Sequence, residues 1–150
     1  MKHYLKTITW KFSDCTTSYP AISDTKIYIR APEDVIKHFR FLFRDEVKER
    51  FVVLWLNAAN RVTGWEIISE GILNSSLVHP REVFRGAIVA TCASVIIAHN
   101  HPSGNPEPSS DDIAITKQVV EAGKIIGIPV HDHIIFAEDN HTSFAERGLI

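Results

Sequence analysis

The sequence predicts an α/β fold of the α+β kind, in which helices flank one mixed β-sheet. Two short apolar runs rich in β-branched residues, at 51–56 and 94–98, indicate strands that are covered on both faces. Segments with apolar residues at helical spacing lie between the predicted strands, which favours helices packed on the sheet. A short turn at 57–61 joins the first run to a second strand, so part of the sheet should be antiparallel.

Each element follows from local signals along the chain. Pro32 and Pro80 mark the starts of two helices, because proline is favoured at the first helical position. Ser109 begins a third helix as its N-cap, with Asp112 in the place of a capping-box acid. The predicted helices are 32–44, 80–92, 109–126 and a short one at 143–147. The proline-rich segment 99–108 is a loop, and the predicted strands are 51–56, 62–69, 94–98 and 129–136.

Residues 1–30 are interpreted as an N-terminal extension ahead of a main domain at 31–150. Apolar residues alternate with polar ones at Ile8, Trp10 and Phe12, and again at 26–30, so this extension could form an edge hairpin or a swapped arm. Exposed aromatic residues on such a hairpin could join two copies of the chain in a homodimer.

Composition narrows the class of protein. The chain has 150 residues, a net charge of −2 and a pI near 6.4, so it lacks the basic footprint of a nucleic-acid-binding domain. A chain this long folds without a structural metal or a disulfide, so a bound metal would be functional. The first residues lack the pattern of a secretory signal, and the two cysteines need not pair. The longest apolar stretch, 86–98, is too short for a membrane span. We therefore expect a cytoplasmic protein with no membrane partner.

Two histidines follow a predicted buried strand. His99 and His101 stand two residues apart, and in extended backbone such residues point to the same face, so both rings can reach one ion. Asp112 follows in the first turn of the next helix. Two histidines and one aspartate leave a fourth tetrahedral position for water, which is typical of a catalytic zinc site. The alternatives are hydrogen-bonded surface histidines and a simple capping box of Ser109 and Asp112.

The order of these residues resembles a known pattern. H-x-H, seven residues, S, two residues and D is the pattern of the JAMM metalloprotease domain, also called JAB or MPN-plus. With VHPREV at 78–83, HNHPSG at 99–104 and DHII at 132–135, the sequence over 49–150 resembles the bacterial RadC family more closely. The resemblance implies a JAB/MPN, cytidine-deaminase-like three-layer architecture for 31–150, Zn²⁺ as the cofactor, and a peptide or protein substrate.

The same resemblance implies roles for single residues. Glu49, at the start of the first long strand, would be the general base that activates a zinc-bound water for hydrolysis of an amide bond. Ser109 would donate a hydrogen bond to the oxyanion. Glu66 and Glu70 remain alternative bases. The zinc ligands would be His99, His101 and Asp112.

A second interpretation stays open beside the hydrolase. A non-catalytic MPN-like scaffold could act in DNA repair, recombination or mobile-element DNA transactions, because the RadC name is tied to DNA repair. The intact motif favours the hydrolase. The segment His131-Asp132-His133 repeats the H-x-H spacing on a predicted strand. We favour a structural role for it, with Asp132 as an acceptor behind a ligand as the alternative.

Overall fold

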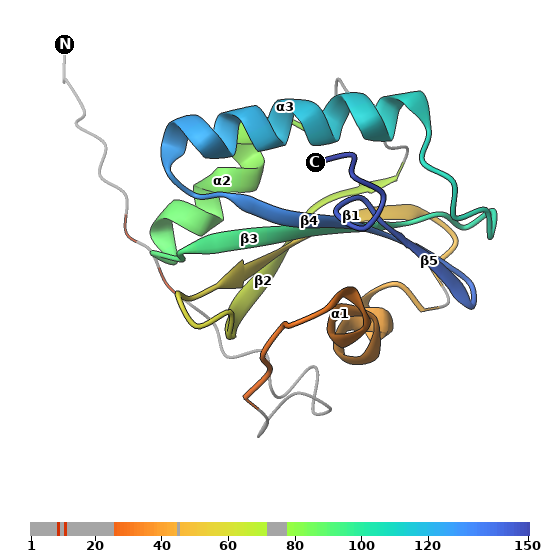
Figure 1. The fold of residues 1–150 in the computed structure, drawn as a ribbon, viewed down its shortest axis with the longest axis horizontal. Coiled ribbons are helices and arrows are strands. Elements are labelled where there is room, and N and C mark those ends of the chain that lie inside the picture. Colours follow the sequence, from red (N-terminus) through yellow and green to blue (C-terminus); the bar gives the residue numbers. More distant parts are fainter. Residues whose placement is uncertain (1–8, 10, 12–25, 45, 72–77) are drawn as a thin grey trace, which may run out of the picture.

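The computed structural model describes residues 9, 11, 26–44, 46–71 and 78–150. Five strands form one mixed sheet in the order β2-β1-β3-β4-β5 (Figure 1). β3 and β4 run parallel, and the other neighbouring strands are antiparallel, which confirms the predicted mixed sheet. The bounds are β1 Glu49–Leu56, β2 Val62–Gly71, β3 Ser94–Asn100, β4 Val130–Ala137 and β5 Asn140–Ser143.

Helices cover both faces of this sheet. α2 (Pro80–Val89) and α3 (Ser110–Ile126) lie on one face, and α1 (Pro32–Phe39) with the 3-10 helix η2 (Arg40–Leu42) lies on the other (Figure 1). Proline is the first residue of α1 and of α2, and Ser109 caps α3, as the sequence signals predict. The α+β fold with three layers is therefore confirmed.

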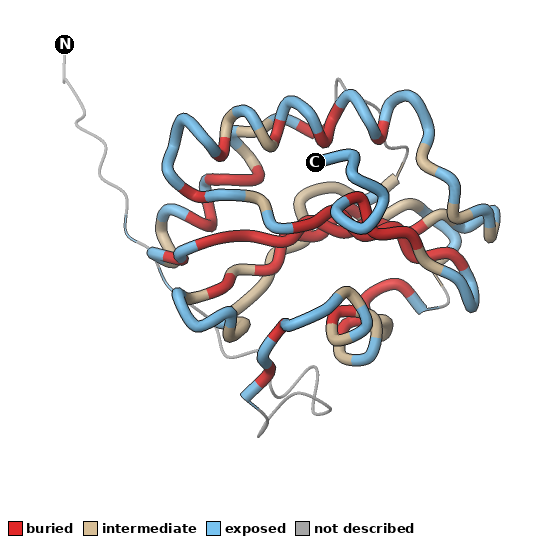
Figure 2. The backbone as a smooth tube through the Cα atoms, viewed as in Figure 1, coloured by how far each residue is buried: buried red, intermediate tan, exposed pale blue. Residues whose placement is uncertain are grey.

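The core has two halves because the side chains of the central strands alternate between the two faces of the sheet. In β1, Phe51 and Val53 pack on the side of α2 and α3, whereas Val52, Leu54 and Leu56 pack on the side of α1. In β3, Val95 and Ile97 also belong to the α2–α3 side. Figure 2 shows β3, at the centre of the sheet, as buried along its whole length. The same alternation directs His99 toward α3.

Some boundaries differ from the prediction. The first helix ends in η2, two residues before the expected limit, and β3 continues to Asn100. The predicted helix at 143–147 is wrong, because β5 pairs with β4 there and turns follow. The Asp132 carboxylate accepts hydrogen bonds from Ser143 Oγ at 2.6 Å and from Ala145 N at 2.9 Å. These bonds hold the chain in a turn where the helix was expected.

The described residues test only part of what the sequence predicts for the N-terminal extension. The strand expected at 26–30 is reduced to an isolated bridge between Tyr28 and Arg61. Ile8, Trp10 and Phe12 lie outside the described residues, so the edge hairpin, the homodimer and the domain boundary remain predictions. Within the described part of the chain, no helix is both long and apolar enough to span a bilayer.

Candidate metal centre

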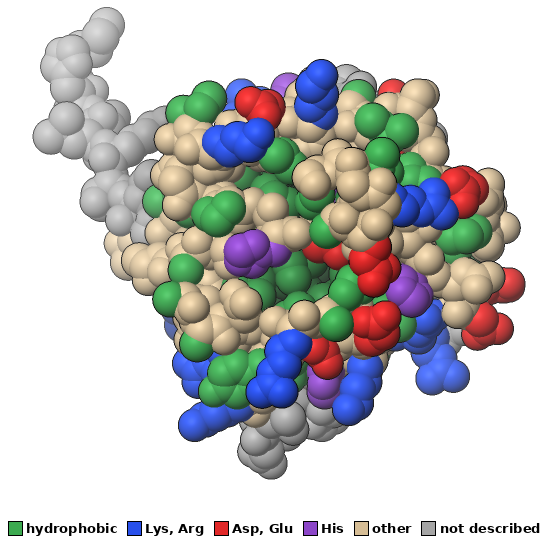
Figure 3. Space-filling model, in the orientation of Figure 1, with side chains coloured by type: hydrophobic (Ala, Val, Ile, Leu, Met, Phe, Trp, Pro, Cys, Tyr) green, Lys and Arg blue, Asp and Glu red, His purple; other side chains and the backbone are tan. Residues whose placement is uncertain are grey.

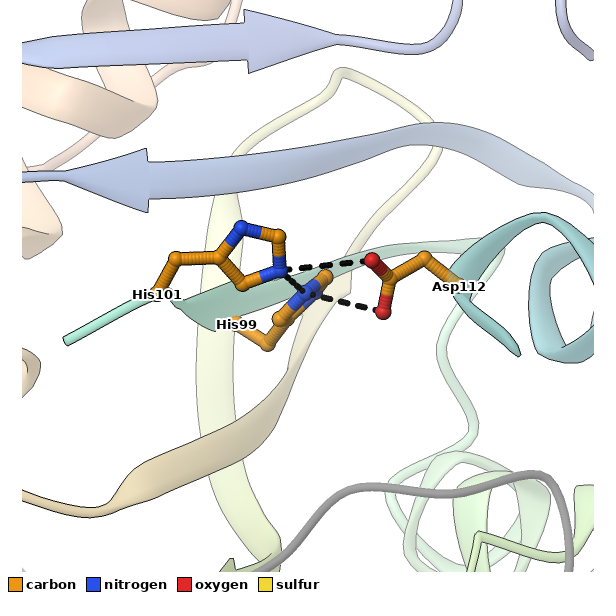
Figure 4. A group of neighbouring side chains, drawn as sticks. All are labelled: His99, His101 and Asp112. Carbon is orange, nitrogen blue, oxygen red and sulfur yellow. Dashed lines mark hydrogen bonds and ion pairs between the residues drawn. The ribbon is translucent and has the colours of Figure 1, made fainter. Parts of the chain in front are cut away.

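Two elements bring the predicted ligands together. β3 carries His99 as its penultimate residue, and His101 follows directly after the strand. The loop that comes next returns the chain to the same face of the sheet, where Asp112 lies in the first turn of α3. Figure 4 shows the three side chains pointing toward one another, from the strand end on one side and the helix start on the other.

The three side chains form a compact cluster. His99 Nε2 lies 2.9 Å from His101 Nε2 and 3.1 Å from Asp112 Oδ1. His101 Nε2 lies 3.2 Å from Asp112 Oδ2. His99 and Asp112 are buried, whereas the side chain of His101 is 11% exposed. The cluster therefore opens to solvent on the His101 side.

Asp112 is oriented by the capping box at the start of α3. Ser109 donates to Asp112 Oδ2 from both its backbone N–H and its hydroxyl, each at 2.7 Å, and accepts from the Asp112 N–H at 3.1 Å. Burial alone would raise the pKa of Asp112, but its close contacts with His101, His99 and Ser109 hold this pKa well below its usual range. The predicted capping box is thus present, and it aims an ionised carboxylate at the two histidines.

The hydrogen bonds of His101 test whether a metal ion fits. His101 Nδ1 lies 2.7 Å from the carbonyl oxygen of Asn105, which can only accept, so the ring proton sits on Nδ1. Nε2 then faces the ionised Asp112 carboxylate and Nε2 of His99. Atoms with lone pairs this close are held together by a proton or by a metal ion between them. Two imidazole nitrogens and a carboxylate are a donor set that zinc binds, so the residues fit this ion.

Glu49 lies on the same face of the sheet as the cluster. Antiparallel pairing sets Phe51 opposite His99, and strand alternation puts Glu49 on the same side as Phe51, toward His101. The pKa of His101 is raised mainly by its hydrogen bond with Asp112 and further by the charge of Glu49. Burial lowers the pKa of His99, and the Glu49 charge opposes this effect. Glu49 also lines a cleft of about 470 Å³ beside the loop after β3.

Asn100, between the two histidines, connects β3 to the start of β1. Its Oδ1 accepts from the Arg50 N–H at 2.7 Å, and its Nδ2 donates to the Lys48 carbonyl at 3.0 Å. These two residues flank Glu49 in the sequence. Asn100 therefore fixes the backbone that carries Glu49 relative to the strand that carries His99.

The alternative bases are engaged elsewhere. Glu66 forms an ion pair with Arg85 of α2 at 3.0 Å. Glu70 forms an ion pair with Arg50 at 3.1 Å, and Arg50 also donates to the Leu42 carbonyl on the α1 side of the sheet. Neither glutamate belongs to the cluster of His99, His101 and Asp112.

The segment 131–133 divides between the two faces of the sheet. Asp132 points toward the α1 side and binds Ser143 and Ala145, which matches the structural role expected for the segment. His133 is fully buried on the other side, with Nε2 2.8 Å from His99 Nδ1. This contact between His133 and His99 was not predicted from the sequence. Strand alternation on β4 was the available signal, but it required the parallel pairing of β4 with β3.

An H-x-H pair at the end of a central strand, completed by an aspartate from the next helix in a three-layer α+β domain, is the arrangement of a JAB domain. A family model described as RadC-like JAB domain matches residues 29–149. The chain belongs to this RadC family.

Curated relatives agree with this assignment. The UPF0758 protein of Salinibacter ruber is 54% identical over 127 residues, which cover 85% of this chain and 54% of that protein. The UPF0758 protein of Desulforamulus reducens is 51% identical over 128 residues, covering 85% and 56%. That of Methanosarcina mazei is 42% identical over 129 residues, covering 86% and 56%. The chain thus spans about half the length of these relatives, and their names state no activity.

Proposed function

We propose that this chain is a zinc-dependent hydrolase, a metallopeptidase or isopeptidase that cleaves an amide bond in a peptide or protein. One observation carries the proposal. The ligand atoms of His99, His101 and Asp112 lie within 4.8 Å of one another, on the face of the sheet to which strand alternation in β1 directs Glu49. Membership of a JAB-type family supports the hydrolytic class.

The roles follow from the chemistry of each group. Nε2 of His99, Nε2 of His101 and the Asp112 carboxylate would hold the ion. When bound, zinc lowers the pKa of a coordinated water to about 7. Glu49 would accept the proton of the attacking water and pass it to the leaving amine. The cleft beside Glu49 offers room for the part of a substrate polypeptide that lies on one side of the scissile bond.

Ser109 has two tasks in this proposal. Its hydroxyl donates to Asp112 Oδ2, so a hydrogen bond to an oxyanion requires the hydroxyl to turn away from that oxygen. The Ser109 N–H still holds Asp112 when this happens, because it donates to the same oxygen independently. One hydroxyl can therefore hold Asp112 in the resting state and stabilise the oxyanion during the reaction.

The alternative, a non-catalytic scaffold in DNA transactions, has weaker support. The net charge is −2. On the face shown in Figure 3, Lys and Arg side chains are interspersed with Asp and Glu, so this face offers no broad basic surface to a phosphate backbone.

The test uses chelator-treated protein reloaded with zinc and a peptide library prepared from a digested proteome. Mass spectrometry would count new amide cleavages made by the wild type, by Glu49→Gln and by Glu66→Gln, at equal zinc content. We expect cleavage by the wild type and by Glu66→Gln. A positioned general base contributes roughly 10²–10⁴-fold, so Glu49→Gln should fall by that factor. No cleavage by zinc-loaded wild type, or equal cleavage by Glu49→Gln, would contradict the proposal.

A further inference from the structure

A chain of hydrogen bonds lies behind the proposed zinc ligands. His99 Nδ1 is 2.8 Å from His133 Nε2, and His133 Nδ1 is 2.5 Å from Thr116 Oγ1. Thr116 Oγ1 in turn is 2.6 Å from the backbone carbonyl oxygen of Asp112. His99, His133 and Thr116 are each no more than 1% exposed, so solvent does not compete for these bonds.

The donor and the acceptor of each hydrogen bond follow from the carbonyl group at which this series of hydrogen bonds ends. A carbonyl oxygen only accepts, so the Thr116 hydroxyl hydrogen goes to Asp112. The Thr116 oxygen must then accept from His133, whose proton is on Nδ1. An imidazole that donates from one ring nitrogen accepts at the other, so Nε2 of the buried His133 ring accepts from His99 Nδ1. The bare nitrogen of His99 is therefore Nε2, which faces His101 and Asp112.

Packing keeps the His133 ring in this orientation. Phe144 stacks on it with ring centres 4.6 Å apart, and Phe51 meets it edge-on at 5.7 Å. Parallel pairing of β3 with β4 sets the backbone of His133 beside Ile97, two residues before His99. The ring cannot flip without losing both of its hydrogen bonds in a site closed to water.

We propose that Thr116 and His133 are positioning residues that fix the tautomer of His99 and so present its Nε2 lone pair to the metal. The inference rests on the proposed function, since it concerns the same centre. Thr116 lies one helical turn after Asp112, so α3 supplies one ligand and orients another. Partners behind a metal-binding histidine change metal affinity by about 10–100-fold when they are removed.

The first test measures zinc affinity by competition with a chromophoric chelator. Thr116→Val keeps the side-chain shape and removes the hydroxyl, and Thr116→Ser keeps the hydroxyl. Ile115→Val, a buried change at the preceding position of α3, is the matched control for loss of packing. We expect Thr116→Val to bind zinc about 10–100-fold more weakly, and the other two variants to bind it as the wild type does. Equal binding by Thr116→Val, or equal weakening by Ile115→Val, would overturn the proposal.

The second test observes the tautomers directly and needs only the folded wild type. Long-range ¹⁵N–¹H NMR of the histidine rings in the zinc-loaded protein should show the His99 and His133 protons on Nδ1, with the His99 Nε2 resonance shifted by the metal. A proton on Nε2 of His133 would overturn the inference while leaving the hydrolase proposal intact. Wild type that binds no zinc would overturn both.

Discussion

Zinc should stabilise the folded chain, because its ligands come together only when β3 and α3 are docked. His99 and Asp112 are buried, and a metal that binds the native state alone adds RT ln(1 + [Zn]/Kd) to the free energy of unfolding. At free zinc one hundred times above Kd this term is about 2.7 kcal/mol. For a chain of 150 residues, each kcal/mol raises Tm by roughly 2–4 °C. The expected increase in Tm is therefore about 5–11 °C.

Scanning calorimetry of chelator-treated protein in buffered zinc would measure this increase. Asp112→Asn keeps the size of the side chain but removes the ligand charge, so it should lose most of the increase. Asp111→Asn is the matched control, because Asp111 is exposed on the same turn of α3 and belongs to no ligand cluster in the described residues. An unchanged Tm of the wild type in zinc, or an equal response of the two variants to zinc, would show that Asp112 does not hold the ion.

Four further outcomes follow from particular contacts. Ser109→Ala should lower the free energy of unfolding by about 1 kcal/mol in urea titrations, since the capping box is lost. An unchanged urea midpoint of unfolding would show that the capping box does not stabilise the fold. Asn100→Ala should slow amide cleavage at unchanged zinc content, because it frees the backbone on both sides of Glu49; loss of zinc instead would contradict that role. Gly86→Ala should lower the free energy of unfolding, measured by thermal unfolding, by about 1–3 kcal/mol. The added Cβ would overlap the Glu66 carboxylate and lie 2.6 Å from the Trp55 ring. Backbone hydrogen bonds, chiefly from Arg30, lower the pKa of Asp34, so its stabilisation is full above the unfolded pKa and fades as pH falls through the folded pKa. The stability difference between wild type and Asp34→Asn should therefore shrink from pH 5 toward pH 3, and a constant difference would contradict this reasoning.

Local signals predicted most of the fold. The runs at 51–56 and 94–98 are apolar apart from Ser94 because both of their faces are covered, and this made them recognisable as central strands. β5 escaped prediction because its sequence, NHTS, is short and polar. The helix expected at 143–147 failed for a tertiary reason, since Asp132 from β4 captures the backbone there.

The candidate site shows the same division. Strand alternation put His99 and His101 on one face and the capping-box spacing put Asp112 at a helix start, and the resemblance to the JAMM pattern joined the three residues into one predicted site. His133 and Thr116 could not be assigned, because their contact depends on the parallel pairing of β3 with β4 and on the rotation of α3 above them. Neither feature is encoded in a local pattern.

The central claim is that His99, His101 and Asp112 hold a zinc ion on which amide hydrolysis depends. Anomalous diffraction from a zinc-loaded crystal, recorded on both sides of the zinc absorption edge, tests its structural half most directly. We expect one anomalous peak bound by Nε2 of His99, Nε2 of His101 and an Asp112 carboxylate oxygen, with Glu49 facing the open coordination position. A crystal grown in zinc with no peak at these atoms, or with zinc held by other residues, would contradict it.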